Sequence, residues 1–132
     1  MTYLEKKATG LWQQAMTLLW RGQCAMCTLP GDAGHHIIGR TYLDSKFSLM
    51  NGIFVCTSCH QWCDDNQDEL VVYLEDHYPA LHKWHVENKP IIMKSSTWHN
   101  TVFFHKRIEE LQFFIKVREG LFLRAFGKRN IR

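Results

Sequence analysis

The stretch that decides the fold runs from Cys24 to His60 and reads C-A-M-C (24–27), G-H-H-I-I (34–38) and N-G-I-F-V-C-T-S-C-H (51–60), with loops between. It contains two C-x-x-C pairs, and 28 residues lie between Cys27 and Cys56. Four thiolates in two such pairs suit one tetrahedral zinc ion. The spacing therefore predicts a structural Zn²⁺ held by Cys24, Cys27, Cys56 and Cys59.

Length and composition indicate one globular domain. The chain has 132 residues, of which 45% are apolar and 22% are charged, an ordinary balance for a folded domain. No apolar run is long enough to cross a bilayer, so no membrane partner is expected. No continuous apolar segment follows the charged N-terminal residues, which argues against a signal peptide and predicts the cytoplasm. Because cysteines stay reduced there, two C-x-x-C pairs favour a metal over disulfides.

Charge is unevenly spread along the chain. Residues 64–76 carry six acids and no Lys or Arg, whereas residues 106–132 carry eight bases against three acids. A basic C-terminal segment on a chain of net charge +3 suits a polyanionic partner, but a solvated tail explains it equally well. Charge alone leaves both interpretations open.

Hydrophobic periodicity predicts helices around a small sheet. Apolar residues recur at three- and four-residue steps in regions that predict helices over 3–20, 69–78, 80–86 and 101–120. Short strands are expected at 34–38 and 53–55, with a loop at 40–50 between them. Thr57 or Ser58 is expected to cap a helix that carries Cys59, His60 and Cys63. Asn88-Lys-Pro90 is expected to be a break, and Ile91-Ile-Met93 fits either a short strand or a packed loop.

These elements predict an α+β protein with one domain over residues 1–132. A small core at 21–66 would carry the zinc, and residues 1–20 and 67–132 would form helical flanks. The expected helix over 101–120 has apolar side chains on more than one face, which suits either the core or the surface of a homodimer.

The three stretches together resemble the HNH endonucleases, the ββα-metal or His-Me finger group. Members of that family place a His pair on the first strand, an Asn at the start of the second strand and a His on the helix that follows. This chain has His36, then Asn51 fifteen positions later, then His60 nine positions after that, within two flanking C-x-x-C pairs. The resemblance covers residues 24–65 and implies a zinc-supported ββα-metal core.

The resemblance also implies roles for single residues. His36 would be the general base that takes a proton from water, and Asn51 would fix the loop between the strands and so hold His36 in place. His35 and His60 would bind one catalytic divalent ion, either Mg²⁺ or Mn²⁺. Asp64 lies one helical turn beyond His60, so it can complete the metal shell or remain a solvated acid.

The chemistry of these residue types fits that reaction. Hydrolysis of a phosphodiester at neutral pH needs a base, and imidazole titrates close enough to neutrality to serve. It also needs a cation to offset charge on the phosphate and on the leaving oxygen. Zinc has the separate task of stabilising a motif that is too small to fix two histidines by apolar burial alone. Cys63 is a candidate replacement for one zinc ligand, with a small buried thiol as the alternative.

The function implied is that of a metal-dependent endonuclease that hydrolyses DNA phosphodiester bonds. It would be of phage or mobile-element type, act on branched or duplex DNA, and work in the cytoplasm of a bacterial or phage-infected host cell. Two alternatives stay open. One is a zinc-stabilised DNA-binding module without catalysis, and the other is a nuclease that acts on RNA.

Basic side chains are the candidate contacts to the DNA backbone. They are Arg40, close after the His pair, and Lys106, Arg107, Lys116, Arg118, Arg124, Lys128 and Arg129 near the C-terminus. Trp98, His99 and Asn100 are weaker candidates for a groove contact. His82 and His85 form an H-x-x-H pattern that fits packing better than a third metal site.

Overall fold

The computed structural model describes residues 1–95 and 98–122. Its elements follow the order α1 (Tyr3–Leu19), β1 (Ala33–His36), α2 (Leu43–Lys46), β2 (Gly52–Val55), α3 (Thr57–Asp65), α4 (Gln67–His77), α5 (Pro79–Met93) and α6 (Thr101–Phe122). The mixture of helices with one two-stranded antiparallel sheet confirms the predicted α+β class. None of the described helices combines the length and the apolar character needed to cross a membrane.

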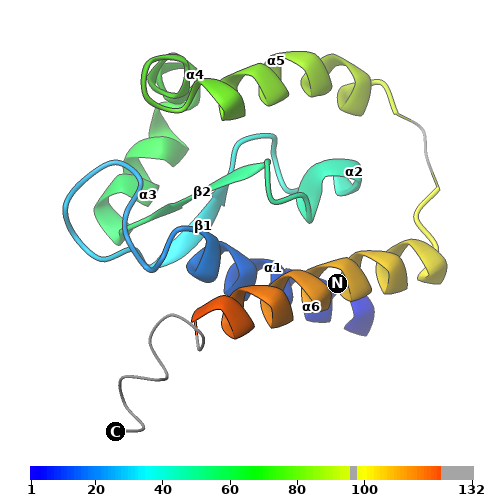
Figure 1. Ribbon diagram of the computed structural model, residues 1–132. Helices are drawn as coiled ribbons and strands as arrows, with labels where there is room; N and C mark the ends of the chain where they lie inside the picture. Colours follow the sequence, from blue (N-terminus) through cyan, green and yellow to red (C-terminus); the bar gives the residue numbers. More distant parts are fainter. Residues whose placement is uncertain (96–97, 123–132) are drawn as a thin grey trace, which may run out of the picture.

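The sheet lies in the middle of the molecule. In Figure 1, α1 and α6 lie together below it, α4 and α5 lie above it, and α3 follows directly from β2. The strands pair in the register Ala33↔Val55, Gly34↔Phe54, His35↔Ile53 and His36↔Gly52. Every residue of β2 is buried. A pair of four-residue strands is too short to be stable alone, so packing against helices must hold it.

Helix α1 packs directly on the sheet because two strand residues lack side chains. A Cβ added at Gly34 or at Gly52 would come within 2.7 Å or 2.6 Å of the Trp12 ring. Trp12 is fully buried, and its indole N–H donates to the Ser48 carbonyl at 2.9 Å. The two glycines therefore leave room for the indole to lie close to both strands.

Two apolar clusters stabilise the chain. The larger one joins α1 to α6 and includes Trp12, Met16, Phe104 and Ile108. The smaller one surrounds the cysteines and joins β2 and α3 to α4. Because the second cluster contains few large buried side chains, apolar burial alone contributes little stability to the segment near the cysteines.

The predicted break at residues 88–90 is wrong. Helix α5 continues through Pro90 to Met93, so the strand or packed loop considered for residues 91–93 is wrong as well. Proline removes one helical hydrogen bond, the one to the carbonyl of Val86. Both Pro90 and the Val86 side chain are exposed, so water can reach that carbonyl. The predicted loop at 40–50 contains the short helix α2. The N-cap residue of the helix after β2 is Cys56, which makes no side-chain capping hydrogen bond, rather than the predicted Thr57 or Ser58.

Candidate metal centres and the cavity beside them

Four cysteines meet at one point between the loop before β1 and the start of α3. The sulfur atoms of Cys24, Cys27, Cys56 and Cys59 all lie within 4.8 Å of one another, and none is in a disulfide. Cys27 Sγ and Cys56 Sγ are 3.6 Å apart. Four sulfurs bound at about 2.3 Å around a tetrahedral zinc would be separated by about 3.8 Å. The donor set and its spacing fit a bound zinc ion or another thiophilic cation.

The four thiols differ in how readily they ionise. Burial opposes the ionisation of Cys24, but backbone N–H groups, including that of Met26, lower its pKa to about 7. Burial and then the neighbouring thiols raise the pKa of Cys59 well above its ordinary value. Four thiolates cannot coexist at this spacing unless a cation offsets their charge.

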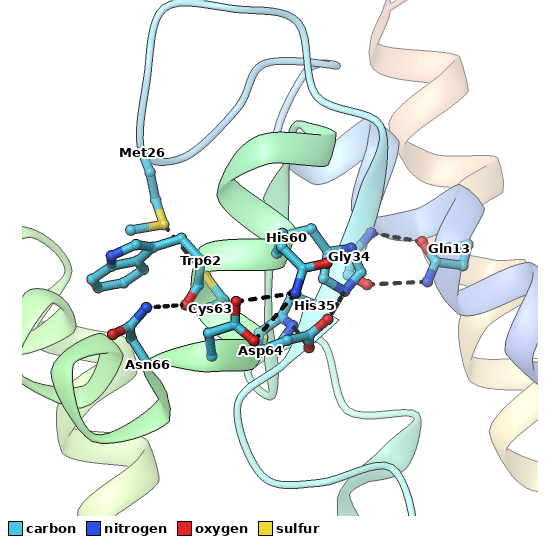
Figure 2. Close-up of polar contacts among 11 residues, drawn as sticks. Gln13, Met26, Gly34, His35, His60, Trp62, Cys63, Asp64 and Asn66 are labelled. Atoms are coloured by element: carbon cyan, nitrogen blue, oxygen red, sulfur yellow. Dashed lines mark hydrogen bonds and ion pairs between the residues drawn. The ribbon is translucent and has the colours of Figure 1, made fainter.

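Cys63 does not belong to this group of four. It is fully buried, and its Sγ lies 3.5 Å from the Met26 sulfur, as Figure 2 shows. Burial raises the pKa of Cys63 to about 11, so it is a neutral thiol. Its contacts are those of a small buried hydrophobe, the second of the two roles considered for it.

A second group of possible ligands comes from β1 and α3. His35, His60 and Asp64 each offer one ligand atom, and these atoms lie within 4.8 Å of one another. His35 Nδ1 is 3.5 Å from one Asp64 oxygen, and His60 Nε2 is 4.0 Å from the other. Figure 2 shows the three side chains pointing toward one another. Ligands at about 2.1 Å from an octahedral ion lie about 3.0 to 4.2 Å apart, so this group can accept a small divalent ion.

His35 is neutral in this environment. Burial lowers its pKa below 6.5, and the neighbouring His60 lowers it further, although Asp64 acts in the opposite direction. Neutral imidazole is the form that binds a metal. Helical spacing alone brings His60 and Asp64 to the same side of α3, and the pairing of β1 with β2 adds His35 to them.

His36 lies on the opposite side of β1 from His35, as strand alternation predicts. Its ring stacks on Trp12 with a centroid distance of 4.0 Å and an interplanar angle of 9°. His36 Nε2 lies 2.9 Å from the Lys46 carbonyl oxygen, which can only accept, so Nε2 carries the proton. Burial lowers the pKa of His36 to about 4. The imidazole is therefore neutral at pH 7, with a lone pair on Nδ1.

Asn51 connects the two ends of the loop between the strands. It is fully buried; its side-chain amide donates to the carbonyls of Ile38 and Ser45, and its oxygen accepts from the Ile38 N–H at 2.6 Å. Ser45 precedes Lys46, whose carbonyl orients His36. The amide thus bonds to the residue before Lys46, whose carbonyl accepts from His36.

Asn51→Ala is expected to destabilise the protein by about 3 kcal/mol, because three buried backbone groups would lose their partner. The free energy of unfolding in urea, with zinc present throughout, measures this. Asn88→Ala is a matched control, since the Asn88 amide makes a single bond to the Trp84 carbonyl on α5. Equal losses in the two variants would contradict this role of Asn51.

His35, His36, His60 and Asp64 line one cavity of about 840 Å³. Arg40 lines it too, and its predicted contact to the DNA backbone stays a prediction. Sequence reasoning missed the contribution of α1, from which Glu5, Thr9 and Gln13 form one wall at four-residue steps. Gln13 also exchanges two hydrogen bonds with the Gly34 backbone and so braces β1 (Figure 2). The four-residue spacing of Glu5, Thr9 and Gln13 was the signal available in the sequence, but it did not show which strand α1 would face.

The basic candidates within the described part of α6 do not line this cavity. Lys106, Arg107, Lys116 and Arg118 lie on α6, and none of them lines it. Arg107 pairs with Glu110 at 3.1 Å, and Arg118 lies over the Phe114 ring. Their predicted contacts to DNA stay predictions. Arg124, Lys128 and Arg129 lie outside the described residues.

The residues before α6 have structural contacts. His99 pairs with Asp44 of α2, and Asn100 accepts a hydrogen bond from the Phe103 N–H at the start of α6. Trp98 is 84% exposed. His99 and Asn100 therefore hold the start of α6 in place, whereas the groove contact predicted for the exposed Trp98 stays a prediction.

The H-x-x-H pair does not form a cluster of ligands. Within residues 1–95 and 98–122, only the four cysteines and the group of His35, His60 and Asp64 bring three or more potential ligands together. His82 pairs with Glu75 of α4 at 3.8 Å, whereas His85 is buried and its Nδ1 has no partner. Packing is the role that these contacts support.

His85 is expected to make the protein sensitive to acid. Burial, then Lys89 and His82, lower its pKa below 6.5. His85 therefore binds a proton more readily in the unfolded chain than in the folded protein. As the pH falls below 6.5, the free energy of unfolding decreases by at most about 1.4 kcal/mol per pH unit. His85→Leu should lose less stability between pH 7 and pH 5 than the native protein in urea titrations. The exposed His105→Leu serves as control, and an unchanged pH dependence in His85→Leu would contradict the prediction.

The chain matches no protein-family model, no curated protein and no solved structure. Its geometry defines a small α+β protein with a four-cysteine cluster that can hold a metal such as zinc. A second potential metal centre and a neutral histidine share one cavity beside that cluster.

Proposed function

We propose that this protein is a metal-dependent HNH endonuclease that hydrolyses DNA phosphodiester bonds. One observation carries the proposal: a three-ligand group and a neutral, stacked histidine line the same cavity from opposite sides of one strand. Hydrolysis of a phosphodiester needs both functions within reach of one phosphate. A protein in which zinc merely supports binding to DNA has no need for either.

Each residue has a defined task in this reaction. His36 takes the proton of the attacking water on Nδ1, because Nε2–H is engaged by the Lys46 carbonyl. Trp12 and Asn51 keep the ring and its supporting loop in place. His35, His60 and Asp64 would hold Mg²⁺ or Mn²⁺, which when bound offsets charge on the phosphate and the leaving oxygen. The four cysteines would hold Zn²⁺ and support the loop before β1.

A homodimer fits the proposed activity. One site of this kind cuts one strand, so cleavage of both strands needs two copies or two successive events. Phe113, Val117 and Leu121 form an exposed apolar stripe at four-residue steps on α6. Such a stripe is suited to contact with a second copy. A phage or mobile-element nuclease that acts on branched DNA in a bacterial or phage-infected cell is the setting we favour.

The proposal is tested with a panel of labelled substrates in Mg²⁺ and in Mn²⁺. Single-stranded, duplex and branched DNA are compared with RNA, and the products are analysed for end chemistry. We expect cleavage of DNA that leaves 5′-phosphate and 3′-hydroxyl ends. Cleavage of RNA alone would show that the substrate is RNA and not DNA. Binding without any cleavage would indicate a zinc-stabilised binding module.

A further inference from the structure

A buried lysine lies in the wall of the cavity. The Lys46 side chain is 7% exposed, and its Nζ is 3.2 Å from an oxygen of Glu5, which is 18% exposed. Lysine is rarely buried without a paired acid. Glu5 comes from α1 and Lys46 from α2, so the pair joins two elements across the edge of the cavity that both residues line.

Lys46 is also closely connected to His36. Its carbonyl oxygen accepts the His36 Nε2–H, which places the two residues side by side. After burial, the positive charges of Lys46 and Arg40 are among the causes that keep the pKa of His36 low. The neutral imidazole therefore has two cationic side chains in its neighbourhood, both on the cavity wall.

Fold stability is a poor explanation for this arrangement. The cost of removing two charges from water often equals or exceeds their attraction, so apolar residues of the same size would serve as well. The ammonium group has three N–H donors; its partners are one Glu5 oxygen, the weakly accepting sulfur of Met1 and the Phe47 ring, whose centroid lies 5.6 Å from Nζ. A phosphate group presents several charged oxygens to these donors, whereas this set supplies a single charged oxygen.

We propose that Lys46 is a phosphate-binding lysine of this cavity and that Glu5 is its counter-ion in the free protein. The DNA backbone would take the place of the Glu5 carboxylate on Lys46 as it enters. The positive charge of Lys46 thus stays beside His36 in the free protein. The negative charge of Glu5 repels other anions, so only a polyanion that is positioned at the cavity displaces it from Lys46. This inference rests on the proposed function in so far as the phosphate belongs to DNA.

The two partners of the pair should act in opposite directions. The probe is a short fluorescent duplex, with Ca²⁺ replacing Mg²⁺ and binding followed by anisotropy at several salt concentrations. Lys46→Met should weaken binding about tenfold and reduce the salt slope by about 1. Glu5→Gln retains the shape and the hydrogen bond but removes the competing charge, so it should tighten binding by about threefold to tenfold.

A purely structural pair predicts a different result. Both variants would then lose stability and change DNA affinity in the same direction or not at all, and either result would overturn the proposal. Glu87→Gln removes the same charge from the exposed Lys83–Glu87 pair on α5, so it controls for net charge. Lys46→Gln removes the charge but keeps a polar side chain beside Glu5; it replaces Lys46→Met in the comparison if that variant loses zinc or structure.

The outcome also separates this inference from the proposed function. If the native protein cleaves DNA but both variants shift the DNA affinity in the same direction, the proposed nuclease function stands and the role proposed for Lys46 is wrong. A native protein that cleaves nothing, with opposite shifts in the two variants, is a phosphate-binding protein without the reaction.

Discussion

Cys59→Ser is expected to abolish zinc binding and the cooperative unfolding of the region around β1, β2 and α3. Structural zinc sites contribute about 10 to 16 kcal/mol of apparent binding free energy, as much as the whole stability of an ordinary domain. The apolar cluster that surrounds the cysteines has few large side chains, with Ile53, Leu70 and Leu74 the largest that are fully buried. It cannot replace that contribution.

Cys63→Ser is the matched control for this prediction, because Cys63 lies one helical turn further along α3 and outside the group of four. It should retain one equivalent of zinc and lose about 1 to 3 kcal/mol through a buried hydroxyl. Metal content and thermal unfolding of the two variants and of the native chain give the measurement. Equal behaviour of the two variants, or a native chain that binds no zinc, would remove the structural role assigned to the metal.

His36→Ala is expected to lower the rate of DNA cleavage by about 10²- to 10⁴-fold, the contribution usual for a general base. The affinity for DNA should change little, because the binding contacts proposed here belong to Lys46, Arg40 and the metal ligands. Zinc content should be unchanged. Single-turnover cleavage at saturating enzyme separates the chemical step from binding.

His77→Ala is the matched control for loss of a stacked imidazole. His77 stacks on Tyr73 at 4.0 Å and bonds through Nδ1 to a backbone carbonyl, much as His36 does with Trp12 and Lys46, but it lies outside the cavity. It should cleave at the native rate. A His36→Ala protein that retains native cleavage would falsify the assignment of the base and leave the cavity as a binding site.

Features of the chain that depend on local spacing could be predicted from the sequence. The C-x-x-C pairs place two sulfurs near one another within a single turn, and His60 and Asp64 share a helix face by periodicity alone. The separation of His35 from His36 follows from alternation along a strand. Helix α5 shows the limit of such reasoning, because Pro90 is tolerated where water can reach the carbonyl that it leaves free.

The sequence by itself predicted the α+β class, the two C-x-x-C pairs and the shared helix face of His60 and Asp64, because these rest on hydrophobic periodicity or on spacings of a few residues. Only the tertiary structure decided that Trp12 supports His36, that Gln13 braces Gly34, and that Glu5 meets Lys46 across the cavity. Those contacts join α1 to residues more than twenty positions away. Periodicity defines which side of a helix is apolar, but packing of the whole chain selects the strand and loop that this side contacts.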